Sequence, residues 1–311
     1  MKKISILLLL IMAVLSLHAQ YNLQNLQPQY LELRTSTDNL IKIYPIKANK
    51  VFTAAHKDIS KFTNLESAIR LNKIVVTEVS TSGTVNTLYA QNISKETIYL
   101  MAGEIIKGGK QDRIIGSDVI ILAGEKKNIS AFCVERGRWS AQESGTKFEG
   151  YSNGVSQNVR KAAVISKNQG EVWANVSQVN SSNGVSSSTG AYTALEKSKE
   201  YKDKMQAYLS VFHSAWDHDP TVVGMIAVSG NKVIGCDIFA THDIFKNAYN
   251  NLLHSYITEA ISNGSTVTIT MTEITKYLEA FLKDESKQEE SLRKNGDVFM
   301  HENMKVHISV F

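Results

Sequence analysis

The first half of the chain alternates apolar and polar residues in short runs, the pattern of half-buried β-strands. Residues 40–46 show the alternation clearly. Further runs, rich in β-branched or aromatic residues and bounded by turn residues, are 73–79, 85–92, 97–102, 118–122 and 128–134. One short helix is expected over residues 64–71, because Asn64 can cap it and Leu65, Ala68 and Ile69 form an apolar face.

The second half has apolar residues at helical spacing. We predict helices over the following segments: 157–165, 172–179, 201–216, 244–261 and 273–282. Residues 222–228 and 232–238 read as a hairpin around Gly230-Asn231, and residues 298–311 as a closing strand. Two polar segments, 140–156 and 180–190, read as loops.

These patterns predict an α+β protein. The β-rich half, residues 20–140, consists of antiparallel strands and one short helix, and the helix-covered half comprises residues 141–311. The β-rich half has only that helix to cover its strands. We therefore expect both halves to share one core within a single domain, residues 20–311.

The N-terminus has the pattern of a secretory signal peptide. Lys2 and Lys3 precede an apolar run over residues 4–17, and Ala19 supplies the small residue that a signal peptidase requires. We expect residues 1–19 to be removed and the mature domain to be periplasmic or extracellular. An uncleaved anchor helix is the alternative, but the run is shorter than the roughly 20 residues of a membrane span.

The charge and the cysteines limit the class of protein. The formal net charge of +4 falls to +2 when Lys2 and Lys3 leave with the signal peptide, so nothing indicates a nucleic-acid partner. Cys133 and Cys236 lie in apolar runs. In an exported protein they could form a disulfide, or each could be a buried apolar side chain. The sequence identifies neither the cofactor, if any, nor the oligomeric state.

Charged residues and glycines are densest over residues 103–139, which read GEIIKGGKQDRIIG and then, after two predicted strands, CVERGRW. If strands 118–122 and 128–134 pair as a hairpin, the two ends of this segment meet. Arginine can bind a carboxylate or phosphate through two parallel hydrogen bonds. The ligand-binding residues that we predict here are Glu104, Lys110, Gln111, Arg113, Glu135, Arg138 and Trp139. The alternative is an ion-pair cluster that only fixes the loops.

Other motifs are weaker. Gly-Gly-Lys is followed by Gln111 where a P-loop needs Ser or Thr. His213 and Asp217 share a helix face, but a helix end explains them better than a metal, and we predict no metal site. Cys133 as a nucleophile would need a nearby base. Asp237 lies in an apolar strand, so its carboxylate requires partners.

The segments GEIIKGGKQDR and CVERGRW resemble a family of uncharacterised proteins with a domain associated with ADP-ribosylglycohydrolases and rhodanese-phosphatase superfamily proteins. The likeness extends over most of the mature chain and includes Trp173, the Ser188-Thr189 region and the segment around Asp237. The resemblance implies no established activity. The family's name is only an associational hint of ADP-ribose or nucleotide chemistry, and export would place this chain away from cytoplasmic nucleotides.

We therefore expect an exported, soluble domain that binds a polar or anionic ligand. One alternative is a hydrolase of a phosphate- or sugar-bearing substrate, with Glu104 or Glu135 as acid/base. These carboxylates would then line an open cleft. The other alternative is a scaffold for a protein partner, which would show a large exposed apolar patch.

Overall fold

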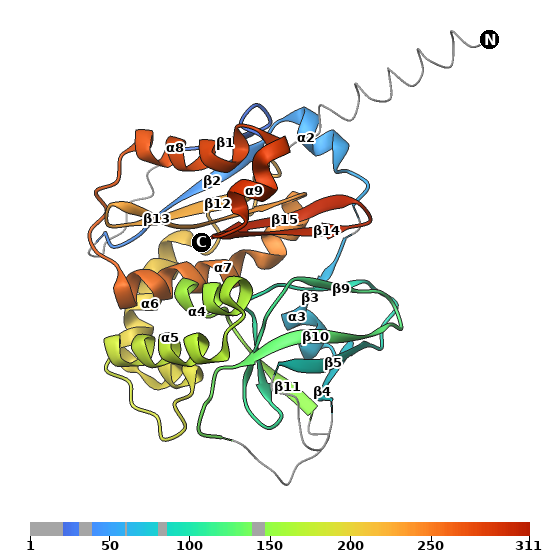
Figure 1. Ribbon diagram of the computed structural model, residues 1–311, viewed down its shortest axis with the longest axis vertical. Coiled ribbons are helices and arrows are strands. Elements are labelled where there is room, and N and C mark those ends of the chain that lie inside the picture. The colour runs from blue at the N-terminus through green and yellow to red at the C-terminus, as the bar shows by residue number, and fades with distance from the viewer. Residues whose placement is uncertain (1–20, 31–38, 60, 80–85, 139–146) are drawn as a thin grey trace, which may run out of the picture.

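The computed structural model describes residues 21–30, 39–59, 61–79, 86–138 and 147–311. The predicted signal peptide, Trp139 and the predicted turn at Ser82-Gly83 lie outside these residues. In Figure 1 a large sheet with helices on both faces lies above a compact β-barrel and a layer of helices.

The large sheet has six strands, all paired antiparallel, in the order β1-β2-β12-β13-β15-β14. Its strands are β1 (Leu26–Pro28), β2 (Lys42–Ala48), β12 (Val222–Ser229), β13 (Lys232–Phe239), β14 (Gly296–His301) and β15 (Met304–Val310). Every residue of β12 is buried, because helices cover both of its faces.

Two sets of helices bury the two faces of this sheet. On one face, α6 (Lys199–Phe212) and α7 (His242–Asn263) pack their aromatic and aliphatic residues against β2, β12 and β13. On the other face lie α2 (Lys50–Ala55) and α8 (Met271–Leu282), with η3 (Glu285–Lys287) and α9 (Gln288–Leu292) following in the chain. The stripe of apolar residues along α7 is thus a core face, as its period predicts.

The front half forms a closed six-stranded barrel with the order β10-β5-β4-β11-β7-β8. Its strands are β4 (Ile74–Glu78), β5 (Thr87–Asn92), β7 (Ile105–Gly108), β8 (Arg113–Ile115), β10 (Lys126–Cys133) and β11 (Lys147–Ser152). A small sheet of β3 (Thr63–Asn64), β6 (Ile98–Leu100) and β9 (Val119–Ile121) adjoins it. The helix α3 (Leu65–Arg70) packs its apolar face into the barrel core.

A layer of helices lies beside the barrel and beneath the large sheet (Figure 1). It comprises α4 (Gln157–Lys161), the π-helical turn η1 (Ala162–Ser166), α5 (Gln169–Ser182) and η2 (Tyr192–Lys197). Val172, Val176 and Val179 of α5 pack against Phe132 and Val134 at the end of β10. This contact positions α5 beside the chain segment that leaves the barrel after β10.

Several predicted elements are confirmed. Asn64 caps α3 by accepting a hydrogen bond from the backbone N–H of Ser67 at 3.0 Å. Strands β12 and β13 form the predicted hairpin. The largest core cluster combines Tyr99 and Met101 of the front half with residues of α6 and α7, so the two halves share one core. Among the described helices none is long and apolar enough to cross a membrane.

Other predictions of local structure are wrong. The strands 118–122 and 128–134 do not form a hairpin, because β9 pairs with β6 whereas β10 pairs with β5 and β8. Residues 147–152, predicted as loop, form β11 and help to close the barrel. The closing strand, residues 298–311, is instead a hairpin of β14 and β15, turning at Glu302 and Asn303, which both have positive φ. The helix α2 had no sequence prediction.

Candidate functional site

The polar segments after β7 and after β10 do meet, but through a pairing that the sequence did not predict. Arg113 of β8 is the register partner of Cys133 of β10. The Arg113 guanidinium is fully buried and contacts Glu78 at 3.4 Å and the amide oxygen of Gln111 at 3.0 Å. Lys110 is also buried, and its backbone N–H donates to Glu78 at 3.1 Å. Three of the predicted site residues thus form a buried cluster with Glu78 at one end of the barrel.

Arg138 is the centre of a second ion-pair cluster. Its guanidinium donates to Glu135 at 2.6 Å and to Asp112 at 2.8 Å, and Glu135 accepts a further bond from Thr189 at 2.9 Å. Arg138 also donates to the carbonyl of Gly109 at 3.2 Å. Its hydrogen bonds therefore tie the CVERGRW segment to the glycine turn and fix both loops.

Glu104 lies apart from these two clusters. Its carboxylate accepts hydrogen bonds from the backbone N–H of Met101 at 2.7 Å and from the Tyr151 hydroxyl at 3.2 Å. Burial raises the pKa of Glu104 to about 8, against the lowering effect of these bonds. Because Glu104 is only 4% exposed and Glu135 is held by Arg138, neither carboxylate lines a pocket described in this structure.

Both cysteines are buried and free. Burial raises the pKa of the Cys133 thiol to about 11, although the Arg113 guanidinium at 2.5 Å opposes this. A thiol with such a pKa is protonated at neutral pH and is a poor nucleophile.

In the described part of the chain no three His, Cys, Asp or Glu residues gather as metal ligands, and this includes the surroundings of His213 and Asp217.

Asp237 has the partners that its place in an apolar strand requires. The Arg160 guanidinium of α4 binds it through two hydrogen bonds of 2.8 and 3.0 Å, and His307 of β15 donates to it at 2.9 Å. The other ring nitrogen of His307 contacts Asp118 at 2.5 Å, and Tyr256 donates a further bond to Asp237. This network, Arg160–Asp237–His307–Asp118, is buried where the barrel, α4 and the large sheet meet.

Gly103 of the GEIIKGGKQDR segment permits the approach of Arg160. It has φ +103°, and a Cβ there would lie 2.9 Å from the Cδ of Arg160. The neighbouring residue Ala102 accepts from the Nε of Arg160 at 3.0 Å and donates its N–H to Asp118 at 2.7 Å. Gly103 and the backbone of Ala102 thus help to hold Arg160 and Asp118 in the buried network.

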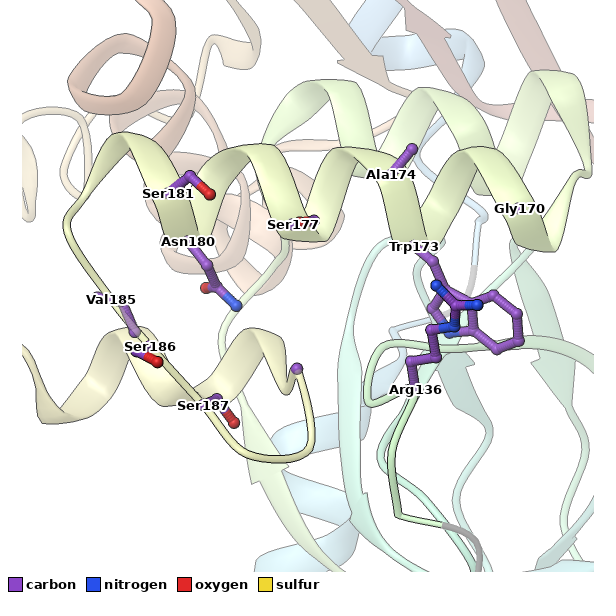
Figure 2. A pocket seen from close by; sticks show the side chains of 11 residues that line it. Arg136, Gly170, Trp173, Ala174, Ser177, Asn180, Ser181, Val185, Ser186 and Ser187 are labelled. Carbon is purple, nitrogen blue, oxygen red and sulfur yellow. The ribbon is translucent and has the colours of Figure 1, made fainter.

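A large open pocket lies elsewhere, beside α5 (Figure 2). Its volume is about 720 Å³. The lining residues come from the CVERGRW segment, α5 and the loop after α5: Arg136, Gly170, Trp173, Ala174, Ser177, Asn180, Ser181, Val185, Ser186, Ser187 and Gly190. We call it the α5 pocket. At one end of it the Arg136 guanidinium lies over the indole of Trp173, with 5.4 Å between the guanidinium carbon and the ring centroid.

Two backbone contacts position the walls of this pocket. The N–H of Gly137 donates to the carbonyl of Thr189 at 2.7 Å, and a Cβ at Gly137 would lie 2.8 Å from the Cα of Thr189. The backbone N–H of Tyr192 donates to the carbonyl of Val134 at 2.9 Å. The loop after α5 is thereby held against the segment that carries Arg136. Arg138 and Glu135, through Thr189, support the same wall.

The α5 pocket contains polar atoms without partners. The indole Nε1 of Trp173 and the amide oxygen of Asn180 are buried, and neither has a hydrogen bond to any described residue. The amide nitrogen of Asn180 donates to the carbonyl of Ala191 at 3.1 Å, which fixes the orientation of the side chain. An unpaired buried polar group costs about 1–3 kcal/mol, so a ligand or water that reached either atom would gain a hydrogen bond that the protein does not supply.

The sequence predicted ligand-binding residues that lie next to this pocket, but not the residues that line it. Glu135 and Arg138 were predicted as ligand-binding residues, whereas Arg136 between them faces the pocket. Trp173 and Asn180 lie on one face of α5, seven residues apart, which is two helical turns. A polar helix face that carries a tryptophan was the available signal. This helix face can be recognised as part of a site only when the segment after β10 is known to lie beside it.

The fold and pocket define an α+β protein that combines a closed barrel, a covered six-stranded sheet and a helical layer, with an arginine–tryptophan pocket at the junction of barrel and helices. The chain belongs to the family of the ARG and Rhodanese-Phosphatase-superfamily-associated Protein domain, whose model matches residues 31–309. No curated protein and no solved structure matches the chain.

Proposed function

We propose that this protein is a binding domain for a small polar ligand that carries an anionic group, and that the α5 pocket is its site. The observation that carries the proposal is the Arg136–Trp173 pair at the end of a pocket that also holds an unpaired indole N–H and an unpaired amide oxygen. As the N-terminal pattern predicts, we propose that the mature protein works outside the cytoplasm.

The chemistry of Arg136 supports an anionic group. In the described part of the chain no acidic side chain pairs with it, so its guanidinium keeps its hydrogen-bonding capacity for a ligand. The planar guanidinium can donate two parallel bonds to a carboxylate or phosphate, and stacking on an indole orients it without using those donors. The adjacent Nε1 of Trp173 adds a further donor.

The size of the pocket agrees with this function. A volume of about 720 Å³ lies within the range of about 300–1,000 Å³ that is typical of small-molecule sites. The pocket walls are also supported by contacts that do not depend on a ligand, namely the Arg138 cluster and the Gly137–Thr189 bond. Such support lowers the ordering cost of binding.

The test is thermal melting of the protein with a panel of carboxylated, phosphorylated and neutral small molecules. We expect anionic compounds to raise the melting temperature, by several degrees at about 100 times the dissociation constant. Arg136→Gln should weaken this binding about tenfold or more, because it removes a charge-assisted hydrogen bond. The matched control is Arg70→Gln, which changes an exposed arginine at the end of α3. The proposal is wrong if both variants respond to anions as the wild type does.

A further inference from the structure

The distribution of charge along the α5 pocket restricts the ligand further, and this inference rests on the proposed function. Among the described residues that line the pocket, Arg136 is the only charged side chain, and it lies at one end (Figure 2). The opposite end presents Asn180, Ser181, Ser186 and Ser187, which are neutral hydroxyl and amide groups. A complementary ligand therefore carries its negative charge at one end and is uncharged and polar at the other.

The spacing along α5 gives the length of such a ligand. Trp173, Ser177 and Ser181 are four residues apart and share a helix face. With a rise of 1.5 Å per residue, the eight residues from Trp173 to Ser181 span about 12 Å, and Asn180 lies about 10 Å from Trp173 along the axis. A single sugar ring is shorter than this span and cannot reach both ends, whereas two linked rings can.

The unpaired acceptor at the far end determines the chemistry there. Asn180 is 6% exposed, its amide nitrogen is held by the carbonyl of Ala191, and its amide oxygen is unpaired. This oxygen needs a donor, so a second carboxylate or phosphate at this end is unfavourable. The neighbouring serine hydroxyls both donate and accept, as sugar hydroxyls do. Apolar lining is limited to Trp173, Ala174 and Val185, which offers little to the side chains of a peptide.

We propose that the α5 pocket binds an acidic saccharide of about two residues, with its anionic sugar at Arg136 and Trp173 and its neutral sugar at Asn180. The anion can be the carboxylate of a sugar acid or the phosphate of a sugar phosphate, because Arg136 binds both through the same fork of donors. The neutral sugar donates a hydroxyl to Asn180.

Calorimetric titration of the full mature chain tests this proposal. The probes are a glucuronate–N-acetylglucosamine disaccharide, trehalose 6-phosphate, D-glucuronate, neutral trehalose and the tripeptide Ala-Ala-Ala. We expect at least one of the acidic disaccharides to bind about tenfold more tightly than D-glucuronate, since the far end adds hydrogen bonds to an unpaired acceptor. The stronger of the two identifies the anion as carboxylate or phosphate. Neutral trehalose and the tripeptide should bind more weakly than either.

Variants separate the two ends of the pocket. Asn180→Ala should reduce the affinity for the better disaccharide to about that of D-glucuronate and should lower the affinity for D-glucuronate much less. Arg136→Gln should weaken both. If Asn180→Ala fails to fold, Ser181→Ala replaces it, with Ser182→Ala, an exposed neighbour outside the lining, as its control. Here we expect only Ser181→Ala to weaken disaccharide binding.

The outcomes distinguish the two proposals. Equal affinities for D-glucuronate and both disaccharides, or tighter binding of the tripeptide, would overturn the saccharide inference. Binding of D-glucuronate that still depends on Arg136 would then leave the anion-binding function standing. If no probe binds in an Arg136-dependent way, the saccharide inference is wrong, and the melting panel with Arg136→Gln decides the anion-binding function separately.

Discussion

Replacing Arg160 by methionine is expected to lower the free energy of unfolding by about 3–5 kcal/mol. Arg160 and His307 oppose the carboxylates of Asp237 and Asp118 in a buried network, so loss of Arg160 leaves one negative charge uncompensated. Urea denaturation followed by circular dichroism measures the effect. The control is Lys204→Met, which removes an exposed ion pair with Glu200 and should leave the stability nearly unchanged.

A double variant sharpens this prediction. In Arg160→Met/Asp237→Leu the buried charge leaves together with its partner, so part of the lost stability should return. The network also joins Asp118, beside the barrel, to β13 and β15 of the large sheet. We therefore expect Arg160→Met also to weaken the packing of the barrel against the large sheet. If Arg160→Met is as stable as Lys204→Met, the network does not contribute as described.

Stability is expected to fall as the pH rises from 6.5 to 9, by on the order of 3 kcal/mol or more. Burial lowers the pKa of His307, but Asp118 and Asp237 outweigh it and raise that pKa to about 9. Burial raises the pKa of Glu104 to about 8. Both groups thus hold a proton in the folded state that they release on unfolding within this range, so folding is favoured at the lower pH.

The other groups with shifted pKa values do not reverse the fall of stability between pH 6.5 and 9. Burial, helped by His213, lowers the pKa of His254 to about 4, which costs stability only as the pH falls below about 6.5. Burial would raise the pKa of Asp237, but Arg160 and His307 hold it well below its usual range, so its contribution is lost only in acid. Denaturation at pH 6.5, 8 and 9 is the measurement. Glu104→Gln should flatten the curve between pH 6.5 and 8, and a stability that rises with pH would contradict the account.

The elements that could be predicted from sequence are those whose signal is local. The apolar period of α7, the Asn64 cap of α3 and the Gly230-Asn231 turn each lie within one segment, and each was found. The barrel closure was missed because it depends on distant pairings. β8 is three residues long within a polar stretch, and β11 is mostly polar, so neither has a strand pattern of its own.

In the candidate site too, the sequence predicts local features but not the contacts between distant segments. The polar density of residues 103–139 indicated a cluster of charges, and Glu135 with Arg138 forms one. The partners of Asp237 lie 77 and 70 residues away in the chain, at Arg160 and His307, so only the need for partners could be foreseen. The α5 pocket likewise joins Arg136, in the segment after β10, to Trp173 and Asn180 of α5.

The indole N–H signals of the three tryptophans, recorded by two-dimensional NMR during titration with D-glucuronate, test the binding site most directly. Trp173→Phe assigns the signal of Trp173, whose Nε1 is buried and unpaired. We predict that this signal shifts on titration, that in Arg136→Gln the same shift needs about tenfold more D-glucuronate or a higher excess, and that the signal of Trp216, buried against α7, stays in place. Saturable binding that leaves the Trp173 signal unmoved would contradict the assignment of the α5 pocket as the ligand site.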